Sequence, residues 1–475
     1  MTVLERIEQA EFLRQNGRMD ECMRICNEIL NERLDTPEAL FMIGRCLLES
    51  GKYGLAHALY MQFLRLKPNV GAAWNNLGRC YQELNQLDEA ERCFRRVLKL
   101  EPDDAVAHSN MGLIHLYRCE PDEAIKYSAK AIDLHPHGGF TSAKHNLGLA
   151  YLLNGDFKNG WENFEASVGY DRDRRERVYG NEERWDGSKG KVVIAYGEQG
   201  IGDEISFASC VPDFIRDCKE AVIECDGRLE GLFKRSFPQA HVYGTRFREV
   251  IDWADKHQLD GRVSFGSLPK HYRNRAEDFP GTPYLVADPE RRVQWRALLD
   301  SLGPKPKIGI SWQGGSNKTG KARRSVSLEA LLPVLKQDAT FISLQYKNAG
   351  EEIQELEDKH GVKVHHWPRA VEATDYDETA ALVAELDCVV SVTTAVIHLS
   401  GALGVPCVVL TPKHPRWFYG LQGESVPWYK SVELVRQKKA NDWLDPINEA
   451  AVRLRKYLNG NHQLLDASSR IARVA

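Results

Sequence analysis

Hydrophobic positions follow two different patterns along this chain, and the change comes near residue 190. Before that point, apolar residues recur at helical spacing and whole segments repeat every 34 residues. After it, short apolar runs such as KVVIAYG (191–197) and CVVSVTT (388–394) alternate with amphipathic stretches. Helical spacing predicts paired α-helices, whereas strand–helix alternation predicts parallel sheets. We therefore expect an all-α part followed by an α/β part.

The 34-residue period is carried by four sets of residues in register. These are Gly44, Gly78 and Gly112; Ala56, Ala90 and Ala124; Leu66, Leu100 and Leu134; and Pro68, Pro102 and Pro136. Small residues let two helices cross closely, and a proline ends the second helix because it has no N–H to donate. The pattern resembles the tetratricopeptide repeat (TPR). With a weaker repeat at about 3–36 and another at 141–174, it predicts a superhelix of about five repeats over 1–174.

Asparagine occupies one repeat position three times, at Asn76, Asn110 and Asn146. A row of amides along a groove offers donors and acceptors to a peptide backbone without selecting side chains. The row resembles the asparagine ladder of the O-GlcNAc transferases, which implies a protein acceptor held in the groove. The alternative is that asparagine is simply frequent at this position of the repeat.

The α/β part is expected to have two halves. Residues 175–190 form a charged junction without an apolar period, and the arginine-rich run at 171–177 is expected to be solvated rather than to bind nucleic acid. A stretch rich in proline and glycine (280–306) interrupts the strand–helix alternation. This predicts Rossmann-like halves at 191–295 and 296–460, followed by a tail at 461–475. In such sheets, ligands bind beyond the carboxyl ends of the strands.

The first candidate site is the loop AYGEQGIGDEIS, residues 195–206, which joins a strand to a helix. Gly200 and Gly202 permit a close approach of backbone to ligand, but their spacing is not the dinucleotide pattern. A carboxylate at the mouth of the loop would repel a phosphate, so Asp203 fits a general base better than a phosphate cradle. The alternative is that Asp203 only caps the helix, where aspartate is favoured.

Two further segments carry groups that suit a diphosphate. The polar loop at 311–325 follows a strand and contains Lys318, Lys321, Arg323 and Arg324. Thr393 and Thr394 stand at a strand end before a helix, and His398 lies one turn into that helix. Cations, hydroxyls and free helix N–H groups all bind phosphate oxygens. The alternatives are a solvated charge run for the loop and a structural role for the histidine.

Taken in order, these motifs resemble the bacterial heptosyltransferase family, whose members have the GT-B fold, and closest the group in which that domain follows TPR repeats. The similar segments include 198–214, 307–315, 323–335 and 377–406. The resemblance implies metal-free, inverting sugar transfer with Asp203 as base and with Arg323, Arg324, Thr394 and the start of the following helix on the donor phosphates. Thr393 stands where the family commonly has aspartate, a departure that bears on the donor and on activity.

The mechanism expected from this resemblance also gives roles to side chains at strand ends. Trp312 and Gln345 would line the sugar or base pocket, and Trp417 would cap it, although these aromatic residues suit a plain core equally well. Asp-x-Asp occurs at 171–173 and 375–377, but neither follows a strand as a cation–diphosphate site requires. We therefore expect no metal at the site and no cofactor other than the nucleotide-sugar substrate.

Composition and charge exclude several classes of protein function. Across the 475 residues the formal net charge is −4, which does not indicate a nucleic-acid or membrane-surface binder. The 11 cysteines include no Cys-x-x-Cys pair, so we expect reduced thiols in a cytoplasmic protein and no zinc site. The start lacks an apolar signal segment, and no apolar run reaches the roughly 20 residues that span a bilayer.

The expected function is a protein glycosyltransferase that transfers a sugar to Ser or Thr of a protein delivered by the repeat groove. TPR-fused enzymes of this kind include flagellin-modifying transferases, so flagellin is the most specific acceptor that the resemblance suggests. Two alternatives stay open: an interaction scaffold with an inactive transferase domain, and a transferase acting on a cell-envelope glycan. Pairing into a homodimer through the ends of the repeats is also open.

Overall fold

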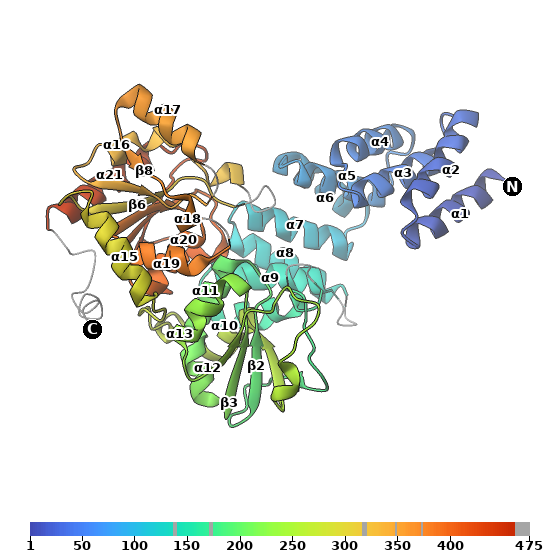
Figure 1. The fold of residues 1–475 in the computed structure, drawn as a ribbon. Helices are drawn as coiled ribbons and strands as arrows, with labels where there is room; N and C mark the ends of the chain where they lie inside the picture. The colour runs from blue at the N-terminus through green and yellow to red at the C-terminus, as the bar shows by residue number, and fades with distance from the viewer. Residues whose placement is uncertain (136–139, 171–173, 316–320, 347–348, 372–373, 461–475) are drawn as a thin grey trace. The chain divides into compact units, whose positions relative to one another are not determined.

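The computed structural model describes residues 1–135, 140–170, 174–315, 321–346, 349–371 and 374–460. The chain forms two compact units, Met1–Tyr151 and Leu152–Ala475 (Figure 1). In the described part of the chain, no helix combines the length and the apolar character needed to cross a bilayer.

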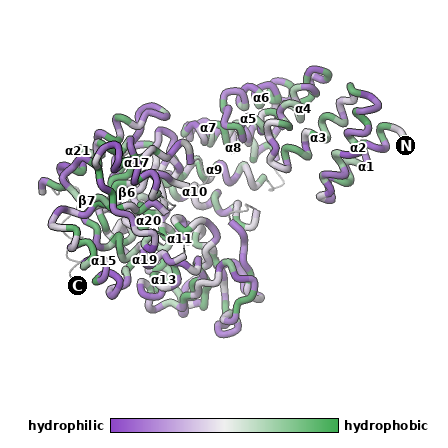
Figure 2. The backbone as a smooth tube through the Cα atoms, turned by 45° about the horizontal axis from the view of Figure 1, so that its top comes forward, coloured by the Kyte–Doolittle hydropathy of each residue, from purple (hydrophilic) through white to green (hydrophobic). Residues whose placement is uncertain are grey.

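The first unit is built from consecutive helices that pack in pairs (Figure 1). They are α1 (Val3–Gln15), α2 (Met19–Glu32), α3 (Pro37–Glu49), α4 (Tyr53–Leu66), α5 (Gly71–Glu83), α6 (Leu87–Leu100), α7 (Ala105–Tyr117), α8 (Pro121–Asp133) and most of α9 (Thr141–Leu153). Along these helices hydrophilic and hydrophobic stretches alternate (Figure 2). The predicted helical repeats are confirmed.

The repeated glycines lie where the helices of a pair cross. A Cβ atom on Gly78 would lie 2.6 Å from the Phe94 ring, and one on Gly44 would lie 3.0 Å from the Tyr60 ring. The contact at Gly78 is closer than real Cβ atoms come to other heavy atoms, and the one at Gly44 is tighter than most, so a larger residue would require the ring or the helices to move. The 34-residue glycine period therefore records the helix crossings within successive repeats.

The second unit contains two sheets. The first has the order β1-β5-β2-β3-β4 and is parallel throughout. Its strands are β1 (Glu183–Arg184), β2 (Val192–Tyr196), β3 (Glu220–Glu224), β4 (His241–Tyr243) and β5 (Gly261–Ser264). Its helices are α11 (Ile201–Phe207), α12 (Val211–Asp217), α13 (Glu230–Ser236) and α14 (Leu268–Tyr272). The central strand β2 is buried on both faces, as expected for a parallel sheet.

The second sheet has the order β11-β12-β10-β9-β6-β7-β8 and is parallel except for the β11–β12 pair. Its strands are β6 (Lys307–Ser311), β7 (Thr340–Ser343), β8 (Val364–His365), β9 (Cys388–Val392), β10 (Cys407–Thr411), β11 (Ser425–Val426) and β12 (Tyr429–Arg436). Its helices are α15 (Pro289–Asp300), α16 (Leu332–Leu335), α17 (Gly350–His360), α18 (Pro368–Val371), α19 (Tyr376–Ala384), α20 (Ala395–Leu403) and α21 (Leu444–Leu458). The prediction of helical repeats followed by two parallel sheets is confirmed.

Helix α10 (Phe157–Phe164) groups with the sheets, although the sequence pattern placed it in the last repeat. Trp161 is 1% exposed, its Nε1 donates to the main-chain oxygen of Arg273 at 2.7 Å, and its ring meets the edge of Trp417. These contacts make α10 part of the core of the second unit.

Arg174 is an exception to the expectation that the arginine-rich run is solvated, whereas the next residue, Arg175, is exposed. It is 1% exposed, and its guanidinium lies 4.2 Å from the centre of the Phe164 ring. It donates to the oxygens of Phe164, Ser167, Ser264 and Ser267 at 2.8–3.1 Å and contacts Glu198 at 3.3 Å. A buried cation needs such partners because burial removes its hydration. Arg174 thereby ties the end of α10 to the first sheet.

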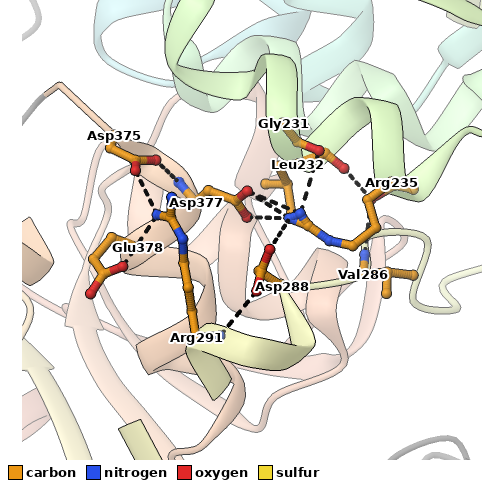
Figure 3. A network of polar contacts seen from close by, with 10 residues as sticks. Gly231, Leu232, Arg235, Val286, Asp288, Arg291, Asp375, Asp377 and Glu378 are labelled. Carbon is orange, nitrogen blue, oxygen red and sulfur yellow. Dashed lines mark hydrogen bonds and ion pairs between the residues drawn. The ribbon is translucent and has the colours of Figure 1, made fainter. Parts of the chain in front are cut away.

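A cluster of ion pairs joins α13, beside the first sheet, to α15 and α19 beside the second (Figure 3). Arg235 binds both carboxylate oxygens of Asp377 at 2.6–2.9 Å and lies 3.8 Å from Asp288. Arg291 contacts Asp375 at 2.5 Å and Glu378 at 3.2 Å. The network fixes the first turn of α19, which also supplies part of the candidate site.

Candidate functional site

A cavity of about 330 Å³ lies between the two sheets of the second unit, where loops follow the carboxyl ends of several strands. Its lining comes from the β2–α11 loop, the β9–α20 turn, the segment after β10, and α19. The described lining residues that carry polar chemistry are Asp203, Arg228, Arg324, Tyr346, Tyr376, Thr379, Thr393, Thr394, His398, Arg416 and Tyr419. This is the position at which doubly wound sheets bind ligands.

Asp203 both caps its helix and faces the cavity. Its Oδ2 accepts a hydrogen bond from the Gly200 N–H at 3.1 Å, and Gly200 and Gly202 also line the cavity. The carboxylate has further lone pairs, so the cap does not exhaust its capacity to accept a proton. The two interpretations of Asp203 are therefore compatible in this geometry.

Gly202 lies at a close contact between the two halves. A Cβ atom on this residue would lie 3.2 Å from His398 Cδ2 and 3.3 Å from Ala395 Cα. The first turn of α11 therefore packs directly against the first turn of α20. This contact brings Asp203 and the start of α20 to one cavity.

The start of α20 is arranged like an anion site. Thr394 is the N-cap residue, and its Oγ1 accepts from the Val396 N–H at 3.3 Å. Arg324 Nη1 donates to the main-chain oxygen of Thr393 at 3.0 Å, which holds the guanidinium at this helix end. Helix N-termini and arginines both favour negative groups. Burial, with the charge of Arg416 nearby, lowers the pKa of Arg324, and an anionic ligand would oppose that shift.

His398 is uncharged at neutral pH. Burial first, and then the charges of Arg416 and Arg324, lower its pKa to about 3. Its ring meets the edge of Phe418 at 4.5 Å, and its Nδ1 lies 3.4 Å from the Tyr429 hydroxyl. A neutral imidazole can donate or accept a hydrogen bond but adds no positive charge. Positive charge in the cavity lining therefore comes from arginine side chains.

Arg228 and Arg416 were not predicted from the sequence. They follow β3 and β10, so the rule that sites form beyond strand carboxyl ends would have selected both segments. Arg228 is held by Asp226 through contacts of 2.6 and 2.9 Å. Among the described lining residues are three arginines and one carboxylate, Asp203; with Asp226 counted as the partner of Arg228, one positive charge remains in excess.

The aromatic wall of the cavity is the segment Trp417–Tyr419, which includes the predicted Trp417. Phe418 is stacked on Trp428 with 4.9 Å between ring centres, so this wall is anchored in the core. Tyr376, on the first turn of α19, faces the same space. Such aromatic faces suit a planar base or the apolar face of a sugar.

Trp312 and Gln345 do not line this cavity, in contrast to the sequence-based expectation. Trp312 is fully buried in the core of the second sheet, with its Nε1 donating to Glu352 at 2.8 Å. Gln345 Oε1 accepts from the main-chain N–H groups of Trp312 and Gln313 at 3.2 and 3.0 Å. Strand alternation turns Trp312 inward, and the amide of Gln345 braces the loop after β6.

The basic loop contributes less to the cavity than expected. Arg324 lines it, whereas Lys321 and Arg323 are partly exposed and are not among the lining residues. Lys318 lies outside the described residues. Gly315, just before that gap, does line the cavity.

The predicted asparagine row is engaged within the first unit. Asn110 Nδ2 donates to Asn75 Oδ1 at 2.8 Å, and the buried Asn146 donates to the main-chain oxygen of Ser109 at 3.3 Å. Asn76 is half-buried. The amides of Asn110 and Asn146 thus link neighbouring repeats, which leaves less of their hydrogen-bonding capacity for a peptide.

Comparison with known proteins identifies the repeats and one relative. Two models described as tetratricopeptide repeat match residues 37–70 and 71–104. The chain is 31% identical to Protein FlbA of Caulobacter vibrioides over 327 residues, which cover 64% of this chain and 54% of FlbA. The chain therefore spans about half the length of this curated relative.

Similar solved structures cover about a third of the chain. MamA 41-end from Desulfovibrio magneticus RS-1 is 24% identical with a TM-score of 0.32, over 36% of this chain and 97% of that one. TTC0263, a thermophilic TPR protein in Thermus thermophilus, is 19% identical with a TM-score of 0.32, over 35% and 90%. The chain is thus a protein with N-terminal tetratricopeptide repeats followed by a region of two largely parallel sheets, and it is similar to FlbA.

Proposed function

We propose that the chain is a glycosyltransferase of GT-B architecture that moves a sugar from a nucleoside-diphosphate donor to a Ser or Thr hydroxyl of a protein. One observation carries this proposal: Asp203 and Arg324 line one cavity together with the N-terminal end of α20, between two parallel sheets. A base facing a cationic helix end matches the needs of this reaction, in which an acceptor loses a proton and a diphosphate departs.

The chemistry follows from these groups. Asp203 accepts the proton of the acceptor hydroxyl while its oxygen forms a bond to the anomeric carbon. The bond from that carbon to the donor phosphate breaks, and the electron pair leaves with the diphosphate. Arg324, Arg416 and the free N–H groups of α20 stabilise the added negative charge. Attack opposite to the leaving group inverts the anomeric configuration.

The protein acceptor is proposed from the repeats. Tetratricopeptide arrays present an extended concave surface that suits a polypeptide rather than a small glycan. The family resemblance makes flagellin the first acceptor to test. The proposed scaffold alternative, in which the second unit binds but does not turn over, is favoured by Thr393 at a position where the resembled enzymes commonly have aspartate.

The test separates binding from chemistry. Asp203→Asn keeps an oxygen that can accept from the Gly200 N–H but removes the base, so nucleotide affinity should persist. Transfer should fall by about 100-fold or more, the usual contribution of a general base. The matched control is Asp104→Asn, which makes the same change at the N-cap of α7, where Asp104 accepts from the Ala107 N–H at 2.6 Å.

Nucleotide binding is measured by calorimetry with a panel of nucleoside diphosphates and their sugars. Transfer to flagellin and to a peptide mixture is measured as a mass increase. Binding without transfer to any acceptor, unchanged by Asp203→Asn, would favour the scaffold. Absence of nucleotide binding by the unmodified protein would exclude the proposed enzyme.

A further inference from the structure

A second cluster of ligand-type side chains lies at the other end of the first sheet from the candidate site. Glu220 begins β3, His241 begins β4, and His257 follows the short helical segment Ala254–Lys256. In a parallel sheet the amino ends of all strands lie on one side, and the cavity with Asp203 lies beyond the carboxyl ends on the other side. The cluster is thus independent of the proposed function.

The three side chains converge on one point. His257 Nδ1 lies 2.5 Å from Glu220 Oε1, and His241 Nε2 lies 3.6 Å from the same oxygen. One ligand atom from each residue lies within 4.8 Å of the other two. Ligands around a tetrahedral zinc ion are roughly 3.3 Å apart, given bonds of about 2.0–2.2 Å. Small movements of the three side chains would bring their ligand atoms to this spacing.

The neighbouring residues orient the ligands. The Tyr243 hydroxyl lies 2.8 Å from His257 Nε2, so the second ring nitrogen has a polar partner while Nδ1 faces Glu220. Trp253 stacks on Tyr243 with ring centres 4.4 Å apart and planes at 5°, which fixes the segment that carries His257. Metal-bound histidines typically have such a partner on the distal nitrogen.

The electrostatics also favour a cation. In the described part of the chain, the ion-pair partners of Glu220 are the two histidines, which are metal ligands when neutral. A different arrangement occurs at Glu329, which binds His360 at 2.8 Å and Lys359 at 2.5 Å. At Glu329 the Lys359 ammonium already supplies the positive charge. The Glu329–His360 pair therefore provides a matched control.

We propose that Glu220, His241 and His257 form a zinc-binding site. Two imidazoles and one carboxylate are ligands that suit zinc, whereas Mg²⁺ and Ca²⁺ prefer oxygen-only sites. His241 is exposed, which leaves solvent access for a water molecule as a fourth ligand. The ion would join β3, β4 and the segment containing Trp253 at a sheet edge. The expectation of no zinc site was based on the spacing of the cysteines, and this cluster contains none.

The test is zinc titration of the full chain at pH 7.5 against a chromogenic chelator, with a thiol-free reductant present. We expect the unmodified protein to hold one zinc equivalent that His241→Ala weakens at least about tenfold. Because His241 is exposed, this change should not disturb folding. Glu220→Gln, which keeps the side-chain shape, should weaken the same equivalent, and His360→Ala should not.

Because all of these variants contain the same cysteines, differences in zinc binding between them do not come from the thiols. Millimolar Mg²⁺ or Ca²⁺ should not displace the zinc. The proposal is overturned if the unmodified protein and both His241→Ala and Glu220→Gln bind the same amount of zinc equally well. It is also overturned if His360→Ala removes the equivalent, or if Mg²⁺ competes with it.

Discussion

The ion pair between Arg235 and Asp377 should contribute measurably to the stability of the second unit. We consider Asp377→Asn, which keeps the side-chain shape and one acceptor oxygen but removes the charge. Three contacts of 2.6–2.9 Å to a carboxylate would be replaced by hydrogen bonding of the guanidinium to one uncharged amide oxygen (Figure 3). Arg235 would then retain only the more distant Asp288, at 3.8 Å, as a carboxylate partner in this cluster.

The expected loss of unfolding free energy follows from how far the two side chains are exposed. The side chains of Arg235 and Asp377 are 22% and 10% exposed. Exposed pairs contribute about 0–1 kcal/mol, whereas breaking a buried pair costs about 3–5 kcal/mol. The partial burial and the remaining contact with Asp288 place the expected loss between these values, at about 2 kcal/mol. A double-mutant cycle with Arg235→Gln should give a coupling of about 1 kcal/mol.

Denaturant unfolding followed by tryptophan fluorescence provides the assay. Of the ten tryptophans, only Trp74 precedes residue 152, so the signal reports mainly on the second unit. Asp338→Asn is the matched control, because the Lys305–Asp338 pair is 58% and 85% exposed and its loss should cost less than about 0.5 kcal/mol. If Asp377→Asn and Asp338→Asn change the unfolding free energy equally, the assigned role of the buried network is wrong.

Two further predictions concern the cavity. Arg324→Gln removes a charge held at the start of α20, so the Kd for a nucleoside diphosphate should rise at least about tenfold by calorimetry, and an unchanged Kd would remove Arg324 from the donor site. His398 has a folded-state pKa of about 3, below its ordinary value of 6.5, so its contribution to stability is complete above pH 6.5 and is lost as the pH falls toward 3. Between pH 7 and pH 5 the unmodified protein should therefore lose about 1 kcal/mol more unfolding free energy than His398→Gln, after allowance for the partial exposure of the ring. Equal losses in the two proteins would show that His398 is not held neutral.

The repeat architecture could be predicted because its period leaves the same residue type at each crossing, as at Gly44 and Gly78. The strands were predictable where both faces are buried, as for β2 and β9. Strand β5 was missed because its sequence, Gly-Arg-Val-Ser, is short and polar. Its pairing with β2 depends on neighbours that local sequence does not reveal.

Residues that line the cavity could be predicted where a side chain lies at the start of the helix that follows a strand, as for Asp203 and Thr394. Prediction from the sequence was wrong where the orientation of a side chain decides whether it reaches the cavity. Trp312 also follows a strand, but the alternation of side chains turns it into the core. Arg416 follows β10 and lies in a segment that the strand-end rule selects, although the rule does not single out the residue. The three residues of the proposed zinc site come from separate segments, and no local spacing connects them.

The buried guanidinium of Arg174 determines how this protein can be shortened for experiments. It is held by α10 on one side and by the first sheet on the other, and Glu198, which it contacts, lies in the loop that leads to Asp203. A fragment that starts at the first long strand, near residue 191, would lack this anchor and would leave Glu198 without its cationic partner. A fragment that starts at Leu152, where the second compact unit begins, retains both Trp161 and Arg174 and is therefore the better choice for studying that unit alone.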